Sequence, residues 1–165
     1  MTHTIEVLVE QLAERFVKTS KKLVIAESCT GGGLSENLTR FPGSSSWFDC
    51  AFVTYSNRSK QDLLSVSADK IEEFGAVSEE IALEMAQGAL RKSSADYSVS
   101  ITGIAGPDGG TNEKPVGTVC IAWCERNQNA TTTRTEFSGN RSRIREQACM
   151  LAMQGLLDIL QKASD

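Results

Sequence analysis

Ser28 stands in a sequence context that is suited to acyl-transfer chemistry. It follows the apolar run Leu23–Ala26, which predicts a buried strand, and it precedes the Gly31-Gly32 pair and a predicted helix. A strand that turns sharply into a helix holds one side chain at the end of a sheet and leaves backbone N–H groups unpaired at the helix N-terminus. Ser28 would be the nucleophile, and these amides would bind an oxyanion or an anionic ligand. The alternative is that Ser28 or Thr30 only caps the helix, as both residue types commonly do.

The choice of a base for Ser28 is limited because the sequence contains one histidine. This is His3, close to the N-terminus, which argues against a Ser-His-Asp triad or a His-based zinc site. A lysine with a lowered pKa is the usual substitute. Lys60 is the candidate, because it follows the polar segment Tyr55–Asn57 on a predicted helix and its side chain could reach back over the sheet edge.

Lys60 would need a special environment to act as a base. Lowering the pKa of a lysine from roughly 10.4 to about 7 costs on the order of 4–5 kcal/mol, which requires burial or a nearby cation. The alternative is a solvated lysine on a helix surface. Tyr55 would relay a proton or orient Lys60, and its alternative role is that of a half-buried packing residue at a strand end.

A basic segment, Ser138–Arg145, opens the last predicted helix. Arg residues at a helix N-terminus oppose the helix dipole, so the cluster indicates an anionic ligand that offsets this effect. Arg141 and Arg145 share one helix face and form the better pair for a phosphate. A solvated basic face is the alternative.

The five cysteines favour reduced thiols in a reducing compartment, because the count is odd and the spacing is not that of a disulfide framework. Cys120 and Cys124 share one face of a predicted strand, but two thiols without further Cys or His ligands make a weak metal site. Cys29 is a weaker candidate nucleophile than Ser28, because the turn should expose only one of the two. We expect no metal and no organic cofactor, since a serine mechanism requires neither.

The composition fits one compact cytoplasmic domain that spans residues 1–165. With 165 residues, of which 40% are hydrophobic, the chain can bury a core. The net charge of −4 at pH 7 argues against duplex nucleic acid or an anionic membrane as a partner. No apolar run approaches the length of a membrane span, and the segment Met1–Thr19 is amphipathic without a signal-peptide core.

The order of the predicted elements indicates an α/β fold, a three-layer α/β/α sandwich with a mixed β-sheet. The expected elements are an amphipathic helix over 5–17 that buries Val17, strands at 23–26, 50–55, 96–102, 118–123 and 131–137, three helices begun by Ser56, Ser67 and Ser78, and a final helix over 144–159. The turns after the first two strands would face each other across a cleft at one sheet edge. The Gly-rich loop Gly103–Pro115 would form a wall of this site.

Four segments of the chain resemble motifs of the CinA C-terminal-domain family. They are Ala26–Gly32, Gly43–Phe48, Phe52–Asn57 and Gly103–Gly110, and they occur in the family order over nearly the whole chain. The family includes stand-alone bacterial nicotinamide-nucleotide amidases, and the chain resembles this single-domain form.

The resemblance implies hydrolysis of the carboxamide of nicotinamide mononucleotide to nicotinate mononucleotide and ammonia, within pyridine-nucleotide recycling. It also implies a Ser-Lys dyad on Ser28 and Lys60 that forms an acyl-enzyme, with Tyr55 close by. We expect the oxyanion donors in the turn after Ser28 or in the Gly103 loop, and the phosphate near Arg141 or Arg145. The residues to which we assign substrate binding are Thr30, Gly31, Gly32, Asn57, Gly103, Arg141 and Arg145.

The expected partner is therefore a small nucleotide, with no nucleic acid and no membrane. We also expect a homodimer or a higher homo-oligomer, because compact α/β domains commonly form symmetric assemblies.

One position departs from the family pattern. Asn140 stands where family members often carry Asp before the residue equivalent to Arg141. We expect the loss of this carboxylate to orient Arg141 less well and to weaken ligand binding. A second hypothesis is accordingly a catalytically weak or inactive paralogue that acts as a nucleotide-binding or regulatory module. A third is a serine hydrolase that acts on a different amide or ester.

Overall fold

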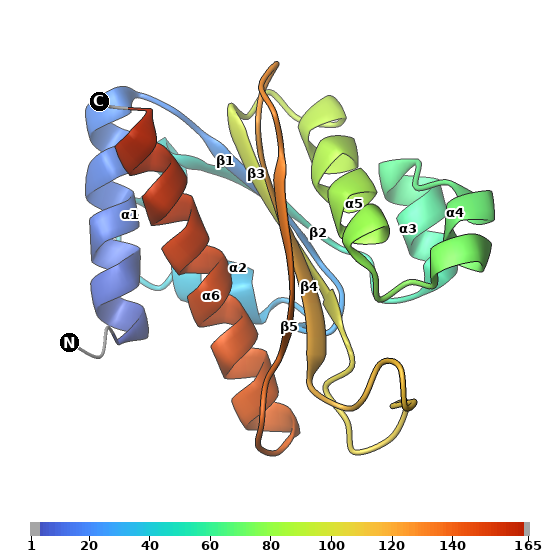
Figure 1. Ribbon diagram of the computed structural model, residues 1–165. Coiled ribbons are helices and arrows are strands. Elements are labelled where there is room, and N and C mark those ends of the chain that lie inside the picture. The colour runs from blue at the N-terminus through green and yellow to red at the C-terminus, as the bar shows by residue number, and fades with distance from the viewer. Residues whose placement is uncertain (1–3, 164–165) are drawn as a thin grey trace.

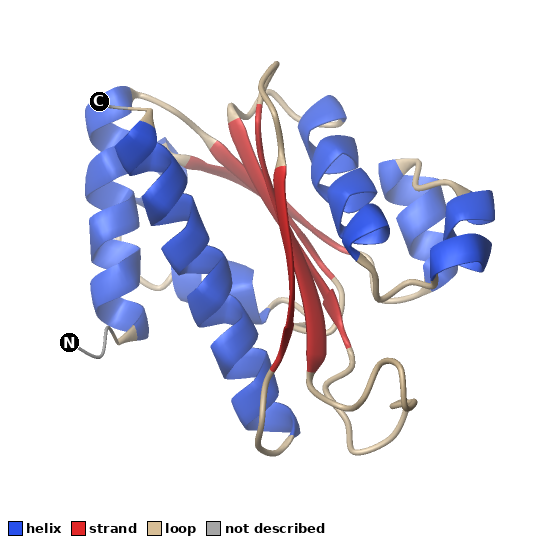
Figure 2. Cartoon of the chain, viewed as in Figure 1, coloured by secondary structure: helices blue, strands red, loops and turns tan. Residues whose placement is uncertain are grey.

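The computed structural model describes residues 4–163, in which a five-stranded sheet lies between two layers of helices (Figures 1 and 2). The strands are β1 (Leu23–Glu27), β2 (Phe48–Val53), β3 (Tyr97–Gly103), β4 (Thr118–Glu125) and β5 (Thr131–Glu136). The helices are α1 (Ile5–Thr19), α2 (Gly33–Leu38), α3 (Asn57–Leu64), α4 (Ala68–Phe74), α5 (Glu79–Arg91) and α6 (Arg141–Lys162), with a short 3₁₀ turn at Ser44–Ser46. Helices α1, α2 and α6 cover one face of the sheet and α3, α4 and α5 lie on the other (Figure 1). The predicted three-layer sandwich with a mixed sheet is confirmed.

The sheet order β2-β1-β3-β4-β5 places the carboxyl ends of three strands at one edge. Strands β2, β1 and β3 are parallel, and β4 pairs with β3 in the antiparallel sense. Glu27 at the end of β1 lies opposite Val53 on one side and Ile101 on the other. The segments that follow β1, β2 and β3 are therefore neighbours, as the pattern of turns predicted.

Strand β1 is the centre of the fold, because all five of its residues are buried. Leu23 and Ile25 belong to the core beneath α1, α2 and α6, whereas Val24 and Ala26 belong to the core beneath α5. A strand whose side chains alternate between two cores has a fixed register, because a shift by one residue would exchange the two faces. The end of β1 is thus a rigid support for the turn at Ser28.

The helix signals in the sequence were mostly correct. The side chains of Ser56, Ser67 and Ser78 accept hydrogen bonds from the third residue of α3, α4 and α5, as N-caps do. The prediction for Val17 was wrong: this side chain is exposed, because it lies one residue past the buried stripe that ends at Phe16.

Two further predictions concern the ends of elements and of the chain. Strand β2 runs over Phe48–Val53 and not over 50–55, so Tyr55 lies beyond the ladder. His3 lies outside the residues that the structure describes. Among the helices within residues 4–163, none is long and apolar enough to cross a membrane.

Candidate active site

The structure brings Ser28 and Lys60 together at the carboxyl edge of the sheet. Lys60 Nζ lies 2.9 Å from Ser28 Oγ, and the two residues are 1% and 8% exposed. Ser28 does not cap α2, since the N-cap position is Gly32 and the side chain that accepts hydrogen bonds from the first amides of the helix is that of Glu27. Both alternative readings, the helix cap for Ser28 and the solvated surface for Lys60, are wrong.

The amine of Lys60 contacts two further oxygens, both of them main-chain carbonyl groups. Nζ lies 2.8 Å from the carbonyl oxygen of Thr54 and 3.3 Å from that of Tyr55. Burial lowers the pKa of Lys60 to about 8. A neutral amine has two hydrogens and one lone pair, so the hydrogens can serve the two carbonyl groups while the lone pair accepts the proton of the Ser28 hydroxyl. This geometry suits a general base.

The path of the chain after β2 explains how Lys60 reaches the serine. The amide of Thr54 donates to the carbonyl oxygen of Glu27 at 2.8 Å, which holds this segment against the end of β1. Ser56 then caps α3 through the amide of Ser59, so the helix begins at once. Lys60 lies in the first turn of α3 and its side chain extends back toward the sheet edge.

Tyr55 contributes to the site differently from either prediction. Its side chain is 58% exposed, because the chain has already left the sheet, so the half-buried packing role is wrong. Its carbonyl oxygen contacts Lys60, whereas its hydroxyl accepts a hydrogen bond from Arg141 at 2.9 Å. The structure therefore places the phenol beside Arg141 and not beside the amine of Lys60.

The carboxylate of Glu27 is a component of the site that sequence reasoning missed. Glu27 is fully buried, and its two oxygens accept five hydrogen bonds. The donors are the amides of Gly32, Leu34 and Ser35 and the hydroxyl groups of Thr30 and Ser35. The sequence signal was a carboxylate at the end of an otherwise apolar strand, directly before a turn rich in donors.

The Glu27 carboxylate changes which amides can bind an oxyanion. The amide of Gly32 donates to Glu27, and the amide of Gly31 donates to the carbonyl oxygen of Ser28 at 3.0 Å, so these two of the predicted turn donors are already paired. The amides of Cys29 and Thr30 donate to no acceptor among residues 4–163. The amide of Cys29 directly follows Ser28, the position from which α/β-hydrolases supply one oxyanion donor, whereas Thr30 is fully buried.

A cleft of about 280 Å³ opens beside the Ser28–Lys60 pair. Ser28, Cys29, Tyr55, Asn57 and Lys60 line one side, and the remaining lining residues are Ala76, Val77, Thr102, Gly103, Ile104, Ala105, Gly106, Asp108, Gly109 and Arg141. The loop between β3 and β4, which extends from the sheet edge in Figure 1, supplies several of these. Thr30, Gly31, Gly32 and Arg145, which were assigned to substrate binding, are not in the lining.

Arg141 and Arg145 do not form the predicted pair. Arg141 donates to the carbonyl oxygen of Gly106 at 2.9 Å as well as to Tyr55, and it lines the cleft. Arg145 lies one helical turn further along α6, a displacement of about 6 Å, and donates to the carbonyl oxygen of Thr30 at 2.8 Å. It lies against the turn after Ser28 and not in the cleft.

Asn140 has a structural role at the start of α6. Its side-chain oxygen accepts a hydrogen bond from the amide of Arg143 at 3.0 Å, and Asn and Asp are both good N-caps. The expectation that Asn140 leaves Arg141 poorly oriented is wrong, because Gly106 and Tyr55 hold the guanidinium instead.

The cysteines show no features of a nucleophile or a metal site. Burial raises the pKa of Cys29 to about 12, which keeps this thiol protonated beside Ser28. Burial likewise raises the pKa of Cys120 and of Cys124 to about 11. Within the described part of the chain, no group of three or more His, Cys, Asp or Glu side chains could hold a metal ion.

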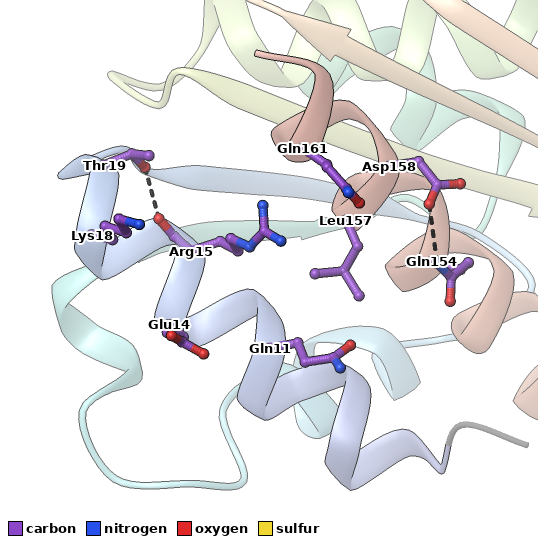
Figure 3. Close-up of a pocket in the computed structure, with 9 residues that line it drawn as sticks. All are labelled: Gln11, Glu14, Arg15, Lys18, Thr19, Gln154, Leu157, Asp158 and Gln161. Carbon is purple, nitrogen blue, oxygen red and sulfur yellow. Dashed lines mark hydrogen bonds between the residues drawn. The ribbon is translucent and has the colours of Figure 1, made fainter. Parts of the chain in front are cut away.

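A larger groove of about 710 Å³ lies between α1 and α6, away from Ser28 and Lys60 (Figure 3). It is lined by Gln11, Glu14, Arg15, Lys18, Thr19, Gln154, Leu157, Asp158 and Gln161. Apart from Leu157 these side chains are polar, and the groove contains no residue that the sequence assigned to chemistry. Size alone therefore does not identify the site.

Comparison with known proteins places this geometry in a family. The sequence profile of the CinA C-terminal domain matches residues 5–160. The chain belongs to the CinA C-terminal domain family. It is 46% identical over 149 residues to the nicotinamide-nucleotide amidohydrolase PncC of Escherichia coli strain K12, with 90% of each chain covered. It is 42% identical over 155 residues to the protein of the same name from Pseudomonas putida, covering 94% of this chain and 96% of that one.

A solved structure of a CinA relative has the same fold. The competence/damage inducible protein CihA from Agrobacterium tumefaciens superimposes with a TM-score of 0.93 at 40% identity, and the alignment covers 98% of this chain and 99% of that one. The arrangement of elements in this CinA-family chain is therefore shared along almost its whole length.

The buried amine predicts a pH-dependent stability for this CinA-family domain. Below pH 8 the folded state carries the full cost of the buried charge, and between pH 8 and 10.5 the unfolded state binds more protons, so stability rises with pH. One pKa unit is worth about 1.4 kcal/mol, so the shift is worth roughly 3 kcal/mol. We expect the stability of the parent relative to Lys60→Met to increase by about 2–3 kcal/mol from pH 7 to pH 10.

Urea unfolding of both proteins at the two pH values measures this difference. Lys92→Met, at an exposed lysine, is the control and should give a pH-independent difference from the parent. A pH-independent difference for Lys60→Met would contradict the lowered pKa.

Proposed function

We propose that this chain hydrolyses the carboxamide of nicotinamide mononucleotide to nicotinate mononucleotide and ammonia. The observation that carries the proposal is the contact of 2.9 Å between Ser28 Oγ and the buried amine of Lys60, both of which line a cleft. The names of the PncC relatives, which are nicotinamide-nucleotide amidohydrolases, support the substrate.

In the proposed mechanism, Ser28 Oγ attacks the carboxamide carbon while neutral Lys60 accepts the hydroxyl proton. The negative charge that develops on the carbonyl oxygen is stabilised by the unpaired amide of Cys29, a residue that lines the cleft. Lys60 then gives its proton to the amide nitrogen, the C–N bond breaks and ammonia leaves. The product of this half-reaction is an ester of Ser28.

The second half-reaction repeats the same proton transfers with water. Lys60 accepts a proton from a water molecule as that water attacks the ester carbon, and the oxyanion again binds to the amide of Cys29. Collapse of the intermediate returns the proton from Lys60 to Ser28 Oγ and releases the carboxylic acid, which ionises to nicotinate mononucleotide by losing its proton to solvent. We assign this reaction to pyridine-nucleotide recycling.

The charges in the cleft fit a nucleotide with a positive ring and a negative phosphate. Arg141 is the one guanidinium and Asp108 the one carboxylate among the lining residues. We assign the phosphate to Arg141, since a guanidinium binds phosphate well and that of Arg141 is held in place by Gly106 and Tyr55. Asn57, at the start of α3, also lines the cleft.

Removal of either member of the pair should abolish turnover. Ser28→Ala lacks the nucleophile and Lys60→Ala lacks the base, so each should release ammonia from nicotinamide mononucleotide at least about 10³-fold more slowly than the parent. Ammonia release is the measurement, with circular dichroism to verify folding, and Lys92→Ala is a control at an exposed lysine. Full activity of Ser28→Ala would exclude the mechanism. Thermal stabilisation of the parent by the nucleotide without product would favour a binding module instead.

The rate should follow the deprotonation of Lys60. The base acts in its neutral form, and burial lowers the pKa of Lys60 to about 8. We therefore expect kcat/KM to rise about tenfold per pH unit below pH 8 and to level off above it. Steady-state kinetics from pH 6 to pH 9.5 would test this, and a profile that is flat over the whole range would argue against Lys60 as the base.

Arg141→Gln should raise KM more than it lowers kcat, because the phosphate contact is the same in substrate and transition state. Loss of a charge-assisted contact predicts a KM increase of about 10- to 100-fold for nicotinamide mononucleotide. Nicotinamide riboside, which lacks the phosphate, is the matched substrate and should be turned over equally by parent and variant. An equal loss with both substrates would assign Arg141 a role other than phosphate binding.

A further inference from the structure

Asp108 is an exposed carboxylate in the lining of the cleft. It lies on the loop between β3 and β4, and it shares the lining with Ser28 and Lys60. Its side chain takes part in no hydrogen bond or ion pair within residues 4–163. Glu27, by contrast, is fully buried, accepts five hydrogen bonds and does not line the cleft. Asp108 is therefore the carboxylate that a ligand in the cleft meets.

The backbone around Asp108 follows a course that depends on two glycines. Gly106 and Gly109 have φ angles of +77° and +94°, in the left-handed region that residues with a side chain disfavour. A Cβ atom at Gly106 would also overlap the side chain of Val116. The carbonyl oxygen of Gly106 accepts a hydrogen bond from Arg141 at 2.9 Å. These features fix the loop against the cleft two residues before Asp108.

The other charged residues of the lining are cationic. Arg141 is always protonated, and burial lowers the pKa of Lys60 to about 8, so this amine is positive below that pH. Arg141 donates to Gly106 and Tyr55, and within the described chain no ion pair joins it to Asp108. The carboxylate and the guanidinium thus do not neutralise each other by contact, and each can act on a ligand.

A nicotinamide nucleotide brings a positive charge into this cleft, because the bond from the ribose to the ring nitrogen makes the pyridine ring a cation. Its carboxamide must lie against Ser28, so the ring lies within the cleft of about 280 Å³. A sphere of this volume has a radius of about 4 Å, which is less than the Debye length of about 8 Å at physiological salt. Every charged lining residue therefore acts on the ring. Lys60 and Arg141 repel it, and among the lining residues Asp108 alone attracts it.

We propose that Asp108 is a specificity-determining residue that selects nucleotides with a cationic, oxidised nicotinamide ring over those with a neutral, reduced ring. This inference rests on the proposed function and narrows its substrate class. The selection suits the chemistry, because a positive ring withdraws electrons from the carboxamide carbon and so eases attack by Ser28 Oγ. The reduced ring donates electrons to the carboxamide instead. Asp108 favours binding of the form that is easier to hydrolyse.

The binding of two nucleotides that differ in ring charge tests this inference. Nicotinamide mononucleotide and its dihydro form share the ribose, the phosphate and the carboxamide, but the ring of the dihydro form is neutral. Both are titrated by calorimetry into proteins that carry Ser28→Ala, which leaves the nucleotides intact. The selectivity is the Kd of the reduced form divided by that of the oxidised form. We expect Asp108→Asn to lower it about three- to fivefold, the size expected for a solvent-exposed charge pair.

Two variants in the same Ser28→Ala background are controls. Asp108→Glu keeps the charge and should retain the selectivity within about twofold. Glu113→Gln removes an exposed carboxylate from the same loop, outside the lining, and should leave the selectivity unchanged.

Salt provides a readout that a purely structural role of Asp108 would not affect. At about 1 M salt the Debye length falls to about 3 Å, so the attraction between the carboxylate and the ring is screened. The selectivity of the protein with Asp108 should then approach that of Asp108→Asn. A selectivity that does not change with salt would contradict the inference.

The outcomes separate this inference from the proposed function. A loss of selectivity in Asp108→Asn would support the inference even if the parent released no ammonia from nicotinamide mononucleotide, a result that would refute the proposed function alone. Unchanged selectivity in Asp108→Asn, together with ammonia release by the parent, would refute the inference and leave the proposed function intact. Equal weakening of both nucleotides is such a case and would assign Asp108 to the shared ribose. Failure of both nucleotides to bind would refute both proposals.

Discussion

The proposed chemistry depends on one unfavourable arrangement, a buried lysine amine that has no carboxylate within hydrogen-bond distance among residues 4–163. Lys60 contacts three oxygens, those of Ser28, Thr54 and Tyr55, and all three are uncharged. Water is excluded, so the protonated form loses hydration that these partners only partly replace. A carboxylate in the same place would restore the positive charge and remove the basicity. Burial of the surrounding hydrophobic side chains, including Leu64 one turn later on α3, offsets the free-energy cost of burying the amine.

The topology of the sheet collects the parts of the site from three neighbouring strands. β1 ends in Glu27 and the serine turn, β2 leads into the two carbonyl groups and the lysine, and β3 leads into the Gly-rich wall of the cleft. Parallel strands place their carboxyl ends together, so residues that are distant in the sequence meet there without long loops. Helix α6 contributes Arg141, which contacts Gly106 at the cleft, and Arg145, which contacts Thr30 in the turn after Ser28. A helix that covers the sheet thus also contacts the site.

Much of the fold could be predicted, because periodicity and capping depend on residues that are close in the sequence. Ser56, Ser67 and Ser78 begin their helices as predicted for this reason. The roles of Glu27 and Arg145 could not be predicted, because each depends on which distant atoms face the side chain after folding. The sequence shows a carboxylate before a turn. It does not show that the amides of Gly32, Leu34 and Ser35 donate to this carboxylate and so are not free to bind a ligand.

Two partners of the Lys60 amine, the carbonyl groups of Thr54 and Tyr55, belong to the main chain, and this affects which mutations the site tolerates. Every amino acid carries the same carbonyl group, so replacing the side chain of Tyr55 leaves the acceptor in place. Only a change in the course of the chain would remove it. Side-chain variation among homologues at the position of Tyr55 is therefore a poor guide to whether Lys60 keeps its acceptors. These acceptors depend on the course of the backbone, which a single substitution rarely changes.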